Sequence, residues 1–463
     1  MFVAFVFLAA HVHAKLISTF ILKSNHILQT KELRELAFLK RVRNLAIIAV
    51  LVIIIVGAYV GYTMVISPKG EEKIIKIGLI TELSGFHAST GLALLPAFEL
   101  IEQYINERLG VMVGGERYNI SLIVRDSRSD VTAAMSYATE LIEEEGCLML
   151  TGTSSSDQGI ALRAYAEKNK IPYLTTMVSS PAVNEPPTDW TYRIQPDAVS
   201  VGAAEAMWAL EQNPNAKIAI MYADNSFSGA IAFGAKYYIE NYANPEQLIY
   251  FQGFPVQQAD FTAASAYVKT LGVDFVLSYH FSANMVQSLL AAGFTTNQVI
   301  SYFMANLSSK RAIVWTEENI LGAVSFLCTD HWYAVSNDDP ERAALYAWFW
   351  PEYKKSYGEI PSEEGLYALD SIFLIRDAIQ RANSLDRTKI NEQLQASVYN
   401  SFSYPGQSIR FDENGGLMLD KYPISRVVEV FNATCSRDEV IALMELPELP
   451  CYELATSYPV YPY

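Results

Sequence analysis

A long uncharged, apolar run near the N-terminus is the feature that most constrains how this chain can fold. It extends from Leu45 to Ile66, 22 residues without one charged side chain. A helix of about 20 apolar residues matches the hydrocarbon thickness of a bilayer. The flank before it is cationic, with the sequence KRVR at 40–43, and cationic flanks stay in the cytoplasm. We therefore predict a single transmembrane anchor over 44–66, a cytoplasmic N-terminus, and an extracytoplasmic remainder.

Charge is divided unevenly between the two sides of this run. Residues 1–43 carry seven Lys/Arg and two Glu, about +5, whereas the whole chain carries −16, which leaves about −21 for the rest. Phosphate binding needs a cationic surface, so we expect no nucleic-acid partner. Residues 1–43 allow several interpretations: a cytoplasmic segment, a short membrane-inserted stretch, a signal-like stretch, or sequence upstream of the true start. His11 and His13 have no third ligand nearby, so we expect no metal there.

The four cysteines fall into two groups. Cys147 and Cys328 lie in apolar, strand-like runs, where a free thiol behaves as a small hydrophobic group. Cys435 and Cys451 bracket a segment near the C-terminus. Outside the cell these two can form a disulfide or stay reduced, and the sequence leaves both alternatives open.

From Ile74 onward, short β-branched runs alternate with longer helical patterns, which indicates βαβ units around parallel sheets. The exterior part is too long for one such core, so we predict two lobes. The fold class is α/β, with two doubly wound, Rossmann-like lobes after one transmembrane helix. The predicted strands are 74–80, 118–126, 147–153, 172–177, 216–223, 248–254, 274–280, 299–305 and 422–432, and the predicted helices are 90–110, 130–146, 156–170, 228–242, 260–272, 283–293 and 362–384.

Several motifs, in order, resemble one known family. They are KIGLITELSGFHASTG (76–91), TGTSSSDQ (151–158), AEKNKIPYLTTMVSSP (166–181), YADNSFSG (222–229) and RFDENGG (410–416). Over about 74–432 the chain resembles type I periplasmic binding proteins of the branched-chain amino-acid and amide receptor group, which serve ABC transporters.

The resemblance implies a Venus-flytrap architecture in which ligand binds between two lobes, at the carboxyl ends of the strands. It implies lobe 1 over 74–195 plus 332–411, and lobe 2 over 196–331 plus 412–434. Residues 435–463 remain as a C-terminal tail. Binding and closure need no bond chemistry, so we expect a protein that is not an enzyme and has no cofactor.

Lobe 1 supplies the first set of predicted ligand contacts. Ser154, Ser155 and Ser156 follow a strand and open a helix, where free N–H groups suit a carboxylate or an amide carbonyl. A plain helix cap is the alternative role for one of these serines. By resemblance, the side chain of Ser179 and the carbonyl of Met177 contact the polar head of the ligand. Thr90 matches an aromatic position of the family, and it can equally be a helix N-cap.

Lobe 2 supplies the second set. Phe227 matches a tyrosine that stacks on the ligand, and Phe281 or Tyr279 matches a second aromatic. Amino-acid binders of the family hold the ligand ammonium with a carboxylate after the strand at 299–305, but here Asn306 stands nearest. A buried ammonium without a carboxylate is costly. Either another acid serves, with Asp330 and Glu364 as candidates, or the ligand is a neutral amide, urea or similar molecule.

We therefore expect a membrane-anchored, extracytoplasmic solute-binding protein of an ABC importer. It would bind an amino acid, an amide or a similar small polar ligand and deliver it to permease subunits. The alternative is an extracellular ligand-sensing domain that works with a separate signalling partner. An enzyme is disfavoured, because the chain has no GxSxG elbow around a serine. The best available catalytic pair, His87 with one of the serines of 154–156, lacks that motif.

Overall fold

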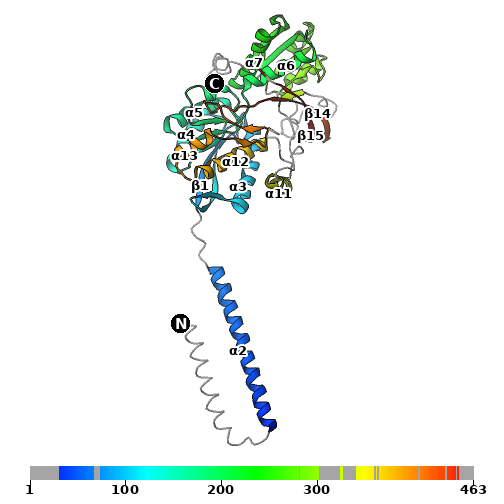
Figure 1. Cartoon of the computed structure of the whole chain (residues 1–463). Helices are drawn as coiled ribbons and strands as arrows, with labels where there is room; N and C mark the ends of the chain where they lie inside the picture. The colour runs from blue at the N-terminus through cyan, green and yellow to red at the C-terminus, as the bar shows by residue number, and fades with distance from the viewer. Residues whose placement is uncertain are drawn as a thin grey trace. The chain divides into compact units, whose positions relative to one another are not determined.

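The structure is a computed structural model that describes residues 31–66, 73–280, 282–301, 324–326, 340–358, 361, 364–404, 407–432, 435–444 and 446–447. The chain divides into two compact units, Met1–Glu72 and Lys73–Tyr463. Figure 1 shows the helix of the first unit and the α/β body of the second.

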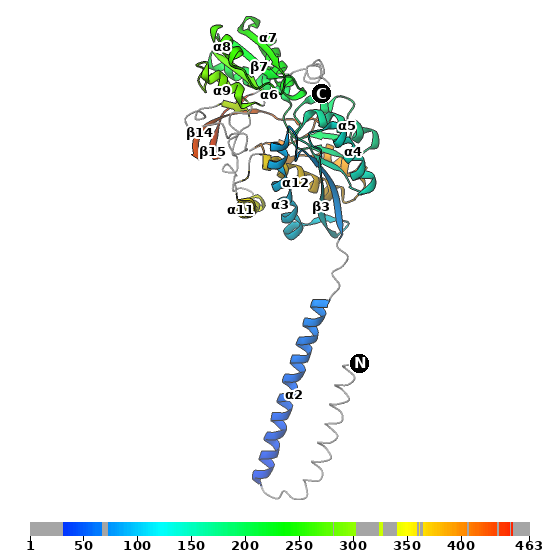
Figure 2. The same cartoon turned by 180° about the vertical axis from the view of Figure 1, so that it is seen from behind.

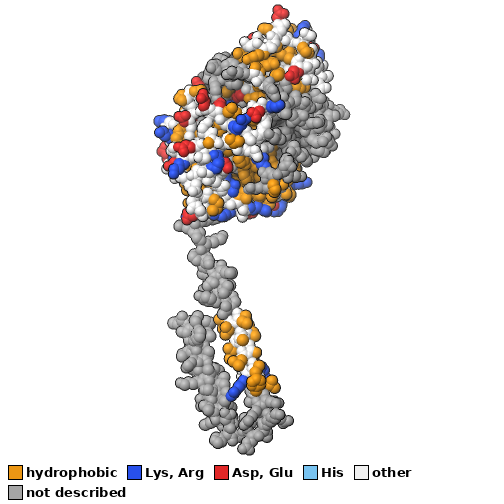
Figure 3. Space-filling view, viewed as in Figure 1, with side chains coloured by type: hydrophobic (Ala, Val, Ile, Leu, Met, Phe, Trp, Pro, Cys, Tyr) orange, Lys and Arg blue, Asp and Glu red, His pale blue; other side chains and the backbone are white. Residues whose placement is uncertain are grey.

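The described part of the first unit is one helix, α2 (Lys31–Ile66). Many of its apolar side chains are more than half exposed, among them Leu45, Ile48 and Ile53. Figure 3 shows hydrophobic side chains along the described stretch of the helix. Among the residues that the structure describes, no helix combines the length and the hydropathy needed to cross a membrane. The side chains of 56–66 lie outside the described part, so the anchor at 44–66 stays a prediction.

The second unit begins with a six-stranded sheet in the order β2-β3-β1-β4-β5-β6. All neighbours are parallel except β2 and β3, which form a hairpin at one edge. Its elements are β1 (Ile74–Thr81), α3 (Ala88–Tyr104), a π-helical turn (Ile105–Leu109), β2 (Val111–Val113), β3 (Glu116–Asp126), α4 (Val131–Thr139), a second π-helical turn (Glu140–Glu144), β4 (Leu150–Gly152), α5 (Ser156–Asn169), β5 (Tyr173–Thr175), a 3₁₀ turn (Pro181–Asn184) and β6 (Thr191–Arg193).

Both faces of this sheet are covered, because the side chains of a strand alternate between its faces. On β1, Ile77 and Leu79 pack into the core cluster that includes side chains of α3 and of α12 (Glu364–Ala382). Ile80 packs into a separate cluster that contains side chains of α4 and α5. Figures 1 and 2 show α3 and α12 on one side of the sheet and α4 and α5 on the other. The first sheet is therefore doubly wound.

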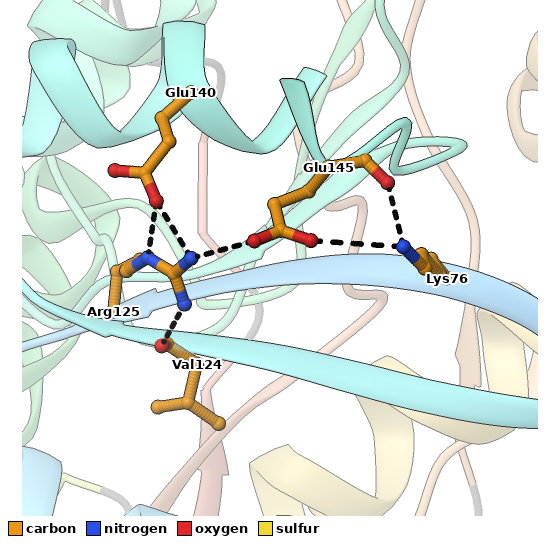
Figure 4. Close-up of polar contacts among 5 residues, drawn as sticks. All are labelled: Lys76, Val124, Arg125, Glu140 and Glu145. Carbon is orange, nitrogen blue, oxygen red and sulfur yellow. Dashed lines mark hydrogen bonds and ion pairs between the residues drawn. The ribbon is translucent and has the colours of Figure 1, made fainter. Parts of the chain in front are cut away.

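An exposed ion-pair network ties β1 and β3 to the turn after α4 (Figure 4). The guanidinium of Arg125 donates to Glu140 Oε1 at 2.9 Å and 2.6 Å and to Glu145 Oε1 at 3.1 Å. Lys76 Nζ donates to the carbonyl oxygen of Glu145 at 2.9 Å. Solvent screens such partly exposed pairs, so the network aligns these segments more than it stabilises them.

A second sheet has seven strands in the order β15-β14-β11-β10-β9-β7-β8. The strands from β8 to β11 are parallel, and β14 and β15 are antiparallel additions. Its elements are α6 (Ala198–Gln212), β7 (Ile218–Ala223), α7 (Ser226–Tyr242), a 3₁₀ turn (Pro245–Gln247), β8 (Leu248–Phe254), α8 (Thr262–Thr270), β9 (Phe275–Tyr279), α9 (Ala283–Ala291), β10 (Val299–Ile300), β11 (Val324–Phe326), β14 (Tyr422–Asn432) and β15 (Cys435–Met444).

The second sheet is covered on both faces in the same way. On β7, Ile218 and Ile220 pack into the core cluster that contains side chains of α6 and α7, whereas Ala219 and Met221 pack into the cluster of α8 and α9. The described residues thus form two α/β lobes, each doubly wound, as the alternation of strand and helix patterns in the sequence predicts. The remaining elements are α11 (Pro340–Tyr357), α13 (Arg387–Gln395), β12 (Tyr399–Asn400) and β13 (Ser408–Ile409).

Some sequence-based expectations differ from the structure. The helix predicted from Thr90 begins at Ala88, with His87 before it, so Thr90 is not the N-cap. Residues 435–463 were assigned to a tail, but Cys435–Met444 form β15, because their backbone pairs with β14. Any bond between Cys435 and Cys451 lies outside the described residues, as does Cys328, whereas Cys147 is buried and free as predicted.

Candidate functional site

The candidate site lies where the parallel strands of the two sheets end. In the first sheet these ends are Thr81 of β1, Gly152 of β4 and Thr175 of β5. The loop after β4 begins with Thr153 at φ 60. This left-handed conformation is strained for a β-branched residue, and such strain is stored mainly at functional sites. The hydroxyl of Thr153 lies 2.7 Å from that of Tyr173, which helps to hold the turn.

Glu82 is the residue that the predicted serines contact most closely. It follows β1 and is fully buried. The backbone N–H of Ser154 donates to Glu82 Oε1 at 3.2 Å and to Oε2 at 3.1 Å, and its hydroxyl donates to Oε2 at 2.7 Å. Ser155 N–H donates to Oε1 at 3.3 Å. Burial raises the pKa of the Glu82 carboxyl, and these hydrogen bonds offset part of that rise.

The other predicted contacts of lobe 1 lie around the same loops. Ser156 is the first residue of α5, and its hydroxyl accepts a bond from the Ser180 N–H at 3.3 Å. The Ser179 hydroxyl donates to Gln195 Oε1 at 3.3 Å, and the Met177 N–H donates to the carbonyl of Thr153 at 3.1 Å. Thr90 is buried in the first turn of α3. The structure thus gathers these residues at one edge, and their contact with ligand stays a prediction.

Lobe 2 contributes the N-terminus of α7. Asn225 caps this helix, since its Oδ1 accepts the N–H groups of Phe227 at 3.0 Å and Ser228 at 2.8 Å. Phe227 is half-buried and packs partly against the core, so only part of its ring is available to a ligand. The hydroxyl of Ser226 donates to Asp157 Oδ1 on α5. This bond joins the helices that open after β4 and β7, so the two carboxyl edges face each other.

Several other predicted residues are placed less directly. Phe281, Asn306 and Asp330 lie outside the described residues. Tyr279 is fully buried at the end of β9, where burial and the nearby carboxylate of Glu205 raise its pKa. Glu364 is fully buried at the start of α12 rather than on the surface, because the apolar helix it opens is itself packed in the core.

Some buried polar side-chain atoms that the structure describes at these edges have no hydrogen-bond partner. In native structures nearly all buried polar atoms have partners. Within the described part of the chain, buried side-chain atoms without a partner include those of Thr81, Ser127, Gln158, Thr175, Ser180, Gln195, Ser228 and Ser278. All of these residues lie in the last two positions of a strand, in the loop after it or in the first turn of the next helix.

His280 follows β9 at the same edge and gives a testable pH dependence. Its Nδ1 accepts the N–H of Ser282 at 3.0 Å, and its Nε2 lies 3.1 Å from the carbonyl of Pro255, so the neutral ring fits both partners. Burial lowers the pKa of His280, despite the opposing influence of the Pro255 carbonyl and of Asp224. Its folded pKa is depressed, so its stabilisation is complete above about pH 6.5 and is lost as the pH falls below that value.

We therefore expect wild-type protein to lose stability relative to His280→Gln as the pH falls below 6.5, with a limiting slope of about 1.4 kcal/mol per pH unit. Urea unfolding at several pH values between about 5 and 8 measures the difference in the free energy of unfolding between the two proteins. Parallel profiles for the two proteins would show that His280 titrates normally.

Comparison with known proteins identifies a family that has this architecture. The sequence pattern of the family described as "Periplasmic binding protein" matches residues 74–432, which is more than half of the chain. The chain belongs to this family. The family match confirms the resemblance drawn from the motifs, and membership implies that the α/β unit works outside the cytoplasm.

Relatives in this family share the length of the α/β unit. A Leu/Ile/Val-binding protein homologue of Brucella suis biovar 1 is 22% identical over 355 residues, which is 73% of this chain and 86% of the relative. The crystal structure of a leucine-binding protein of Thermotoga maritima superposes with a TM-score of 0.65 at 22% identity and covers 80% of this chain and 99% of its own.

Neighbours with different ligands share the fold. A branched-chain amino-acid transporter substrate-binding protein of Streptococcus pneumoniae, in complex with isoleucine, has a TM-score of 0.64 at 18% identity, with coverage of 80% and 99%. A solute-binding protein of Rhodopseudomonas palustris, in complex with 3,4-dihydroxybenzoic acid, has a TM-score of 0.63 at 19% identity, with coverage of 82% and 99%. Membership in the family makes this chain a binding protein and not an enzyme.

Sequence reasoning missed three residues of the site: Glu82, Asp157 and Ser226. All three lie inside the motifs that carry the family resemblance. A carboxylate directly after a buried strand was the available signal for Glu82, because such a group must find donors when the strand end is covered.

Proposed function

We propose that this chain is an extracytoplasmic solute-binding protein of an ABC importer, which binds a small polar ligand between its two lobes and delivers it to a permease. The observation that carries the proposal is the meeting of the two carboxyl edges through Ser226 and Asp157. Open α/β sheets bind ligands at these edges. The named relatives and neighbours that bind leucine, isoleucine or a benzoic acid in the same fold support a ligand of this size.

The binding residues in this proposal are those that the edges bring together. Thr90, Ser156, Met177 and Ser179 serve from lobe 1, and Phe227 serves from lobe 2; Phe281 and Asn306, which lie outside the described residues, remain predicted contacts from the sequence alone. In this proposal the lobes keep the boundaries predicted from the sequence, and β15 is added to lobe 2, where it pairs with β14. Because ligand fills the space between the edges, binding holds the lobes in the closed arrangement that a permease recognises.

A thermal-shift screen of the full chain in mild detergent tests the binding function. Ligand that binds only the folded state stabilises it by about 2.7 kcal/mol at a hundredfold excess over Kd. We expect stabilisation by at least one member of a panel of amino acids, amides, urea and aromatic acids, and we expect Phe227→Ala to weaken it. A panel that stabilises nothing would contradict the proposal.

We also propose that α2 anchors the protein as a single-pass membrane helix with a cytoplasmic N-terminus. The support is the exposed apolar surface from Leu45 to Ile55, preceded by Lys40, Arg41 and Arg43. Fractionation of expressing cells with an alkaline wash should leave the full chain in the membrane pellet. Release by the wash would contradict the anchor. Co-purification with a kinase or chemotaxis partner, instead of permease subunits, would favour the sensing alternative.

A further inference from the structure

Glu82 occupies a loop whose donors suit an anion. Two backbone N–H groups and one hydroxyl of Ser154 and Ser155 point at its carboxylate, and both carboxylate oxygens accept from them. These are the same groups that the sequence predicts for a ligand carboxylate. The anion that they bind in this structure is a side chain of the protein itself.

The backbone around Glu82 is held on both sides, so its side chain has little freedom to leave. Asp126 Oδ1 accepts the N–H groups of Leu83 at 2.8 Å and Ser84 at 3.2 Å, and Asp126 Oδ2 accepts the Ser84 hydroxyl at 2.7 Å. The first turn of α3 packs on the other side, where a Cβ atom at Gly91 would come within 2.1 Å of the carbonyl oxygen of Glu82.

Of the charged side chains that the structure describes at this edge, Asp157 has the same sign as Glu82 and Arg193 is already bound, whereas Arg128 lies exposed in the loop after β3. Asp157 follows the serine loop and accepts the hydroxyl of Ser226. Arg193 ends β6, but it is buried and donates to Asn184 Oδ1 and to the carbonyl of Gln195. A ligand carboxylate at the loop would therefore meet the carboxylate of Asp157 and donors that Glu82 already uses.

We infer that Glu82 determines the ligand class of this protein, by filling the anion-binding loop of lobe 1 and restricting the ligand to a head group without negative charge. The inference rests on the proposed binding function. The fitting ligands are small molecules with a neutral or cationic head group, such as amides and amines, which the charge of Glu82 does not repel. A second carboxylate within about 4 Å of Glu82 would be repelled strongly enough to cost at least about a hundredfold in affinity.

The test uses full-length protein and pairs of compounds that differ only in the head group: isobutyramide with isobutyrate, benzamide with benzoate, and leucinamide with leucine. We expect wild-type protein to bind the amide of at least one pair, at least about a hundredfold more tightly than the acid. In Glu82→Ala the loop donors become available, so the preference should shift toward the acid by at least about tenfold. Calorimetric titration measures both affinities.

A matched control lies at the other end of α5. Glu167 also accepts backbone N–H groups, those of Asp189 at 2.9 Å and Trp190 at 3.0 Å. Glu167→Ala removes a similar set of bonds without touching the serine loop, so it should lower stability and leave the acid-to-amide preference unchanged. If Glu82→Ala does not fold, Glu82→Gln keeps the side-chain volume, removes the charge, and should still relax the discrimination.

A second measurement does not depend on the ligand. Sodium formate or acetate should stabilise Glu82→Ala by occupying the vacated donors, and should not stabilise wild-type protein or Glu167→Ala beyond sodium chloride at equal concentration. Wild-type protein that binds an acid as tightly as its amide, or absence of formate rescue, would overturn the inference and leave the binding function standing. Failure of every pair to bind, together with formate rescue, would overturn the binding function and leave Glu82 as the occupant of an anion site.

Discussion

Replacing Gly202 by alanine is expected to lower the free energy of unfolding of lobe 2 by about 3 kcal/mol or more. Gly202 lies on α6, and a Cβ atom there would come within 1.9 Å of the carbonyl oxygen of Ile231 on α7. Gly234 on α7 faces the backbone of Val199 on α6 in the same way, at 2.0 Å. The two helices cross at these glycines, and backbone atoms cannot move aside as a flexible side chain can.

Helix propensity opposes this effect and is too small to reverse it. Alanine favours a helix interior over glycine by about 1 kcal/mol, so a position without close neighbours would gain stability. Urea unfolding of Gly202→Ala, Gly234→Ala and the double variant measures the balance. The double variant should cost less than the two single variants together, because one separation of the helices relieves both overlaps.

Glu240→Ala is the matched control on α7. It removes an exposed ion pair with Lys236, and such a pair contributes only about 0.5 kcal/mol. An unfolding midpoint of Gly202→Ala equal to that of Glu240→Ala would show that the helices do not pack this closely.

Replacing Asp370 by alanine is expected to cost about 3–5 kcal/mol. Asp370 lies on α12 and is fully buried. Its Oδ1 accepts the Phe402 N–H at 2.7 Å, and its Oδ2 accepts the Ser401 hydroxyl at 2.8 Å and the Ser403 N–H at 2.9 Å. Alanine leaves the Phe402 N–H and the Ser401 hydroxyl buried without the acceptor they use, while the Ser403 N–H keeps its bond to the Ser401 hydroxyl oxygen. Burial raises the pKa of Asp370, and the same donors offset part of that rise.

Two further variants separate the role of the carboxylate from that of the helix. Asp370→Asn keeps one acceptor oxygen and should cost less than Asp370→Ala. Asp377→Ala changes the same residue type seven positions later on α12, where it removes a partly exposed pair with Arg381 and should cost less than about 1 kcal/mol. Equal losses for Asp370→Ala and Asp377→Ala in urea unfolding would contradict the buried network.

Local patterns predicted much of the regular structure. Short β-branched runs predicted β1, β3, β7 and β9, because strands covered on both faces are apolar nearly throughout. The amphipathic pattern over 362–384 predicted α12, because burial of one helix face imposes a fixed period on the chain. The sequence did not predict α11 and α13. Their apolar residues contact the core of neighbouring segments, as Phe349 and Ile390 do. The apolar residues of α11 show no strong period, and α13 is short and has few apolar residues.

The candidate site divides in the same way. Ser154–Ser156 and Phe227 were predicted because a loop between a strand and a helix is a local feature. Glu82 was not predicted, because its role depends on a loop 72 residues further along the chain. Asp157 and Ser226 are 69 residues apart, and they form a hydrogen bond only because the two lobes come together.

The sequence by itself determined the family, the α/β class and the edge at which polar loops collect, because period, strand-end composition and motif order are all written along the chain. Tertiary structure alone decided which partner each polar group takes. The local sequence does not decide whether the donors of Ser154 and Ser155 bind a ligand or a neighbouring side chain. These donors bind Glu82, because β1 and β4 pair in parallel and their carboxyl ends lie together. The buried carboxylate and the N–H groups of the loop are therefore within hydrogen-bonding distance.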